Sequence, residues 1–188
     1  MPSTSSFAPI RKAIGKFDRT ALIALIGELH ALNTQNRDFL ATRFVSSNSG
    51  LDKYKKIIRK ALYPNWPHEN TDISFRDARK AISDYRKAAG DSEGIAELYV
   101  FASECGVQLT FEYGDINEPF YDSLERMYAA AVKTVATLDP QTAAPLIDRL
   151  RALVSKTENM GWGLHDFVSG EFYDNFDDND DNQATSPA

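Results

Sequence analysis

Cysteine and histidine are scarce in this sequence, and their scarcity excludes several kinds of site. The single cysteine, Cys105, has no second thiol with which to form an internal disulfide or a thiolate metal site. The three histidines, His30, His68 and His165, show no HExxH spacing, and no segment carries the Glu-x-x-His pairs of a di-iron bundle. The sequence therefore predicts no metal and no other cofactor, and a reducing, cytoplasmic setting is expected.

Long apolar runs and catalytic motifs are also missing. No stretch approaches eighteen uncharged apolar residues, so neither a membrane-spanning helix nor a membrane partner is predicted. The first residues, MPSTSSFAPIRK, lack the basic start and apolar run of a secretory signal. No GxSxG, P-loop lysine or GxGxxG motif occurs, so we assign no catalytic residue and favour a protein that is not an enzyme. One enzymatic alternative stays open, because sequence spacing does not report spatial convergence: a site assembled by folding from Glu97, Tyr99, Glu112, Asp115 and His165.

The apolar residues that are present recur with a helical period almost throughout the chain. No segment alternates apolar and polar residues as a strand does, so the expected fold class is all-α. Short connections predict antiparallel neighbours, arranged either as a single compact bundle or as a short stack of helix pairs. We expect seven or eight helices: 19–32, about 35–46, 51–63, one that starts at Ser74 and stops at Gly90, 93–113, 118–138, 140–157 and a short segment at 164–173.

Three regions are predicted along the chain. Residues 1–17 form a flexible arm, residues 18–173 form the helical domain, and residues 174–188 form a disordered acidic tail with too few apolar side chains to order itself. Residues 164–182 alternate aromatic and acidic side chains, and a further hypothesis docks them on the basic residues Arg76, Arg79 and Lys80.

Within the helical domain, three local patterns carry structural expectations. The helix at 19–32 has apolar residues on several sides and is expected to be central and deeply packed. Gly106, inside the helix at 93–113, costs about 1 kcal/mol relative to alanine, so a close helix crossing is expected there. Cys105, on the apolar side of that helix, is expected to be buried and unreactive.

Charge is distributed unevenly over a chain whose net charge is -6. Residues 1–90 hold sixteen Lys/Arg against eight Asp/Glu, whereas residues 91–188 hold five against nineteen. Such asymmetry indicates an anionic partner for the basic half, mutual attraction of the halves, or simply solvated faces. On the acidic side, Glu93, Glu97 and Glu104 share one side of their helix and are expected to form a solvated face.

The basic half supplies the candidate binding residues. Clustered cations at helical spacing could bind phosphate groups, and Tyr54, Tyr63, Trp66 and Tyr85 could stack on bases. However, Tyr54 and Tyr85 lie on packing sides and no helix-turn-helix spacing is present, so nucleic acid is not the favoured partner. The candidate residues for an anion or nucleic acid are Lys53, Lys56, Arg59, Lys60, Arg76, Arg79, Lys80, Arg86 and Lys87.

Several segments between residues 53 and 128 resemble a known family. They read KYKKIIRKALYP, KAISDYRKA, AELYVFASECG and YGDINEPFYDSLERM, and a leucine-rich helix precedes an N-x-D-F-L segment at 36–40. These features resemble a family of small uncharacterised bacterial proteins, a domain of unknown function, over roughly residues 18–138. The resemblance implies a compact helical bacterial protein and brings no catalytic or binding residues.

The first functional hypothesis is a non-enzymatic helical module that works by contact with other macromolecules, either a protein partner or a second copy of itself. The absence of a convergent acid–base, nucleophile or metal set motivates it. The alternative is a nucleic-acid-binding protein that uses the basic face of residues 53–87.

Overall fold

The computed structural model describes residues 6–44, 47–64, 72–88 and 90–176. All regular structure in these ranges is helical and no strand occurs in them, which confirms the all-α prediction for this part of the chain. The helices are α1 (Phe7–Ile14), α2 (Arg19–Leu32), α3 (Thr34–Phe44), α4 (Ser47–Leu62), α5 (Phe75–Ala88), α6 (Ser92–Tyr113), α7 (Glu118–Val135), α8 (Pro140–Lys156) and α9 (Leu164–Phe176).

Local capping residues explain where several helices begin and end. The side chains of Asp18, Asp91 and Asp139 accept hydrogen bonds from the backbone amides of α2, α6 and α8, satisfying N–H groups that have no partner within the helix. The Ser74 hydroxyl accepts from the Asp77 amide at the start of α5. Gly90 follows α5 with φ 71°, a conformation that glycine adopts without a side-chain clash. The predicted start at Ser74 and the predicted stop at Gly90 are confirmed.

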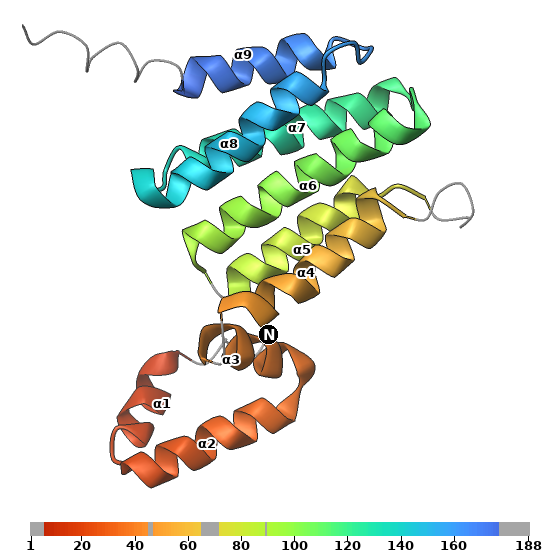
Figure 1. Ribbon diagram of the computed structural model, residues 1–188. Coiled ribbons are helices and arrows are strands. Elements are labelled where there is room, and N and C mark those ends of the chain that lie inside the picture. Colours follow the sequence, from red (N-terminus) through yellow and green to blue (C-terminus); the bar gives the residue numbers. More distant parts are fainter. Residues whose placement is uncertain (1–5, 45–46, 65–71, 89, 177–188) are drawn as a thin grey trace, which may run out of the picture.

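The helices from α4 to α9 form a short stack of antiparallel pairs (Figure 1). The pairs are α4/α5, α6/α7 and α8/α9, with α6 between α4 and α8 on one side of the stack. One continuous apolar core runs through all six helices, from Tyr54 to Phe172. The stack is one of the two architectures left open by the sequence.

The crossing of α6 and α7 is close because of Gly106. A Cβ atom at this position would lie 2.6 Å from Cδ1 of Leu124, which is fully buried in α7. The expectation that a close helix crossing accompanies Gly106 is therefore confirmed.

The N-terminal helices project from the stack (Figure 1). Helix α2 packs on α3, which in turn packs on α4 and α5. No residue of α1 or α2 is buried, so the prediction that 19–32 is central and deeply packed is wrong. Apolar periodicity identified the helix, but it could not tell whether the rest of this chain covers its sides.

The two ends of the chain also differ from the sequence-based outline. The structure places helix α1 inside the segment assigned to a flexible arm, capped by the Ser6 hydroxyl, which accepts from the Ala8 amide at 3.3 Å. Residues 174–176, assigned to the tail, complete the last turn of α9. The described part of the hypothetical docking segment packs on α7 and α8, at the opposite end of the molecule from α3, rather than on α5 (Figure 1). Residues 177–188 lie outside the described residues.

Candidate functional site

Three surface features are candidates for function: the basic side chains of α4 and α5, a groove between α4, α6 and α8, and the apolar arm formed by residues 7–32.

The structure does not gather all nine basic candidates into one uninterrupted surface. Lys53 pairs with Asp38 of α3, Lys80 lies 2.5 Å from Asp84, and Arg76 lies 3.6 Å from Asp77. The other six candidates are exposed and make no ion pair with a described residue: Lys56, Arg59, Lys60, Arg79, Arg86 and Lys87.

The aromatic side chains expected to stack on bases serve other purposes in the described structure. Tyr54 and Tyr85 are buried against each other, with ring centroids 5.3 Å apart. The Tyr85 hydroxyl donates to Asp91, and burial together with this bond raises its pKa. Tyr63 donates to Glu112 across the groove. Trp66 and His68 lie outside the described residues.

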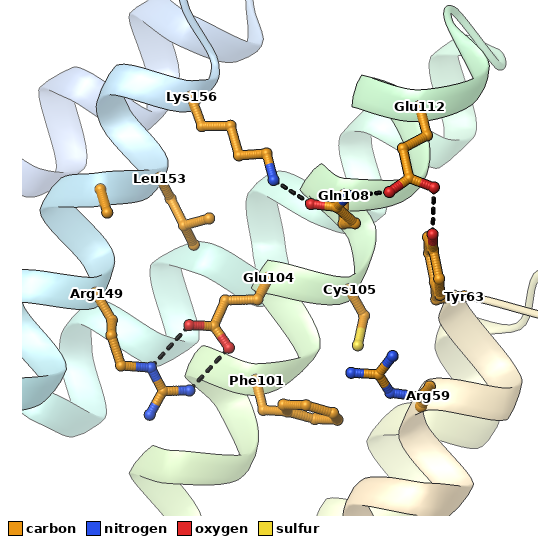
Figure 2. Close-up of a pocket in the computed structure, with 11 residues that line it drawn as sticks. Arg59, Tyr63, Phe101, Glu104, Cys105, Gln108, Glu112, Arg149, Leu153 and Lys156 are labelled. Atoms are coloured by element: carbon orange, nitrogen blue, oxygen red, sulfur yellow. Dashed lines mark hydrogen bonds and ion pairs between the residues drawn. The ribbon is translucent and has the colours of Figure 1, made fainter.

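The groove lies along the side of the stack made by α4, α6 and α8 and has a volume of about 520 Å³ (Figure 2). Arg59 enters it from α4, with its guanidinium 5.6 Å from the ring centre of Phe101 and 6.0 Å from that of Tyr63. No ion pair links Arg59 to a described residue. The structure therefore places the Arg59 guanidinium beside two aromatic rings of the groove.

One wall of the groove is an ion-pair cluster between α6 and α8. Arg149 donates to both carboxylate oxygens of Glu104, at 2.7 and 2.8 Å, and also to Glu97 (Figure 2 shows the Glu104 bonds). Lys55 of α4 lies 2.6 Å from Glu97. The prediction of a solvated acidic face is therefore wrong for these two glutamates, because cations of neighbouring helices cover them, whereas Glu93 is exposed.

The electrostatics of this cluster follow from its geometry. Burial alone would raise the pKa of Glu97, but hydrogen bonds from Arg149 and Lys55 outweigh it and hold the pKa below its ordinary value. Hydrogen bonds to Glu104 raise the pKa of Arg149 in the same way. Glu97 and Arg149 are therefore charged at neutral pH, and the cluster joins α4, α6 and α8 rather than supplying an acid or base.

A chain of hydrogen bonds forms the other end of the groove. Lys156 donates to Gln108, Gln108 donates to Glu112, and Tyr63 donates to the same carboxylate (Figure 2). The bond from Tyr63 is the main reason that the pKa of Glu112 is lowered. Each of these side chains is hydrogen-bonded to another side chain of the groove, so the arrangement contains no activated base.

Cys105 forms part of the groove floor. Its side chain is 5% exposed, which confirms the predicted burial. Burial raises the pKa of the thiol to about 12, although Arg59 opposes the shift. A thiolate nucleophile is consequently not formed at neutral pH.

The five residues of the enzymatic alternative do not come together. Glu97 and Glu112 are fifteen residues apart on α6, which corresponds to about 22 Å along the helix axis. Asp115 accepts a hydrogen bond from Tyr121, and His165 lies 3.3 Å from Thr157. Within the described ranges, no group of three His, Cys, Asp or Glu side chains is placed to hold a metal ion.

The apolar arm is the feature that sequence analysis missed. Fifteen large hydrophobic side chains are exposed on the described part of the protein, and ten of them lie in residues 7–44. On the arm itself the exposed fractions run from 37% to 72%, for Phe7, Ile10, Phe17, Leu22, Ile23, Ile26, Leu29 and Leu32. The sequence signal for the arm is the all-round apolar character of 19–32, which predicts that the helix is covered but does not show whether the cover belongs to the same chain.

The arm is held in a defined position by its turn. The Asn33 side chain accepts from the Asn36 amide at 2.8 Å, and the Asn36 side chain donates to the Leu29 carbonyl, also at 2.8 Å. These bonds fix α2 against α3.

Searches of family models, curated proteins and solved structures find no match for this chain. The resemblance to an uncharacterised bacterial family therefore stays a prediction. Among the described helices, none combines the length and apolar character needed to cross a membrane.

Proposed function

We propose that this protein is a non-enzymatic helical module that works by binding another protein through the apolar arm, residues 7–32. The exposure of α2 is the observation that carries the proposal. A helix with apolar side chains on all sides is ordinarily buried, and α2 has only α3 as a substantial described neighbour.

The amount of exposed apolar surface supports an interaction role. Isolated exposed hydrophobic residues are normal, and the five outside residues 7–44 are of this kind: Ile57, Phe111, Tyr113, Trp162 and Tyr173. The eight exposed hydrophobic residues of the arm follow one another at short intervals along α1, the connecting residues and α2. Contiguous apolar surface of this kind marks contact sites in soluble proteins.

The groove supports the same class of function. Its carboxylates are paired with cations or hydrogen-bonded, and its thiol is protonated at neutral pH. A reaction would need a group poised to accept or donate a proton near neutral pH. The groove side chains instead bind one another and so link α4, α6 and α8.

A photo-cross-linking experiment tests the proposal. A photoreactive phenylalanine analogue replaces Ile23, which is 58% exposed on the arm, or Ile57, which is 42% exposed on the stack and serves as the matched control. We expect irradiation in the expressing cell to give one defined protein adduct from position 23 and none from position 57. That partner should then bind the purified chain stoichiometrically. Identical diffuse labelling from both positions would contradict the proposal.

Nucleic-acid binding remains the rival proposal, favoured by the six exposed candidate cations of α4 and α5 that make no ion pair with a described residue. Its test is the fluorescence anisotropy of labelled RNA and duplex DNA at about 50 and 200 mM salt. A phosphate-binding surface should bind more weakly at the higher salt and lose further affinity in the double variant Lys56→Glu, Lys60→Glu. An absence of binding at the lower salt would eliminate the rival and leave the protein-binding proposal unaffected.

A further inference from the structure

We infer that the protein bound by the apolar arm is a second copy of this chain, and that the two α2 helices pack antiparallel about a two-fold axis. This inference rests on the proposed function, because it names the partner of the same surface. It specifies the occupant, the orientation and the residues at the centre of the contact.

The geometry of α2 defines which side is open. Ala21 and Leu25 are half-buried, and the helical period places them on the side of α2 opposite Ile23 and Ile26. Ile23 and Ile26 lie on the other side, where they are 58% and 48% exposed. Positions 19, 23, 26 and 30 recur at intervals of four, three and four residues, so they form one continuous side of the helix. This is the spacing with which helices pack along one another.

Within the described residues, the arm is the largest group of exposed apolar side chains that the protein offers to a second copy. At the opposite end of the stack, α9 exposes Asp166, Gly170, Asp174 and Asn175, with Tyr173 as its single exposed large hydrophobic residue. A head-to-tail arrangement would therefore bury the apolar side of α2 against polar groups. Pairing arm with arm instead buries apolar surface against apolar surface and closes the assembly at two copies.

The area is sufficient for a dimer. At roughly 200 Å² for each fully exposed large side chain, the eight partly exposed residues of the arm present on the order of 800 Å². A stable interface buries about 800 Å² per partner. Two arms that cover each other thus approach the size of an ordinary dimer interface without help from the stack.

Charge selects the antiparallel orientation. The beginning of the arm carries four exposed cations, Arg11, Lys12, Lys16 and Arg19, against the single carboxylate Asp18. A parallel pair would place eight cations together. An antiparallel pair brings each basic end toward Glu28 and the C-terminal end of α2, where helix carbonyls carry partial negative charge.

Sedimentation velocity of the full chain tests the inference over about a 100-fold range of concentration. We expect a species of twice 21.0 kDa for the unmodified protein. Ile26→Glu should weaken dimerisation by at least about 100-fold, because a carboxylate would be buried in each half of the contact. Ile57→Glu changes an isoleucine of similar exposure, 42%, outside the arm and should leave the dimer unchanged. Far-ultraviolet circular dichroism verifies that both variants remain folded.

Cysteine cross-linking tests the orientation, since the chain's own thiol is buried. Single cysteines replace Arg19, Ile23, Ile26 or His30 along the open side. In an antiparallel pair, only the position nearest the two-fold axis should form a disulfide-linked dimer rapidly, and Arg19→Cys should not. Rapid linkage at all four positions would indicate parallel helices and overturn the proposed orientation.

Other outcomes separate the inference from the proposed function. A monomer at every concentration overturns the dimer, and cross-linking of its arm to a different protein would leave the proposed function standing. A monomer that binds anionic vesicles through the arm overturns both. A ladder of larger species would also overturn the inference, because two-fold pairing closes at two copies.

Discussion

Replacing Arg149 with methionine should destabilise the protein more than any other surface-charge substitution on α8. Arg149 makes three hydrogen bonds that join α8 to Glu97 and Glu104 of α6. A hydrogen bond to a charged group contributes about 1.5–3 kcal/mol, but water replaces part of this because the Arg149 side chain is 33% exposed. Glu97 also keeps Lys55 as a partner. We therefore expect the free energy of unfolding to fall by about 2–3 kcal/mol.

Urea unfolding followed by circular dichroism measures this loss. With an m value of about 2 kcal/mol/M, the midpoint should fall by about 1 M at pH 7. Arg151→Met is the matched control on the same helix, because the Arg151 side chain is 56% exposed and its ion pair with Asp148 spans 3.1 Å within α8. Arg151→Met should lower the free energy of unfolding by no more than about 1 kcal/mol.

The pH dependence gives a second test of the same reasoning. The pKa of Glu97 is lowered from 4.5 in the folded protein. A carboxyl of this kind stabilises the fold above its unfolded pKa, and that stabilisation is lost as the pH falls through the folded pKa. The difference between the unmodified protein and Arg149→Met should therefore be full at pH 7 and shrink as the pH falls below 4.5. The reasoning would be refuted if the two methionine variants lost equal stability, or if the difference did not change on acidification.

Three further predictions concern the stack. Cys105 should resist thiol reagents in the native protein at pH 8 and react fully after unfolding, because burial raises its pKa to about 12; rapid native labelling would contradict this. Gly106→Ala should lower the free energy of unfolding by about 1 kcal/mol, because overpacking against Leu124 exceeds the gain in helix propensity. Gly170→Ala, in open space on α9, should instead raise it by up to about 1 kcal/mol, and equal effects would show that the crossing is not tight. Asp91→Ala should cost about 2 kcal/mol in thermal or urea unfolding, since it removes both the α6 cap and the acceptor of Tyr85. Asp91→Asn keeps an oxygen that can accept from the Gly94 amide, and its NH2 group can donate to the Tyr85 hydroxyl, so a comparable loss in this variant would argue against the capping role.

The elements of the fold were predictable because their determinants are local. Asp18 and Asp139 lie directly before their helices, and Gly90 directly follows α5, so spacing along the chain located these boundaries. The burial of Cys105 followed from its place on an apolar side of α6. The choice between bundle and stack was not predictable, because it depends on which helices pack together rather than on where each begins.

The candidate site was less predictable because its contacts join distant residues. The spacing of Glu97 and Glu104 correctly placed them on one side of α6, but their partner Arg149 lies about fifty residues further along the chain. Similarly, Arg59 belonged to a regular basic pattern, yet the fold turns it toward Phe101 and the groove. Charge patterns in sequence predict which side chains share a helix face, but not which face of another helix covers them.

The error about α2 differs in kind from these, and it bears on function. The composition of 19–32 correctly indicates a helix that is stable only with apolar neighbours on more than one side. The described structure supplies α3 on one side and leaves Ile23 and Ile26 exposed on the other. If the helix is to be covered as its composition requires, the missing neighbour comes from outside the described structure. Because the other described helices present no comparable apolar surface, pairing of two arms satisfies this requirement with the fewest additional components.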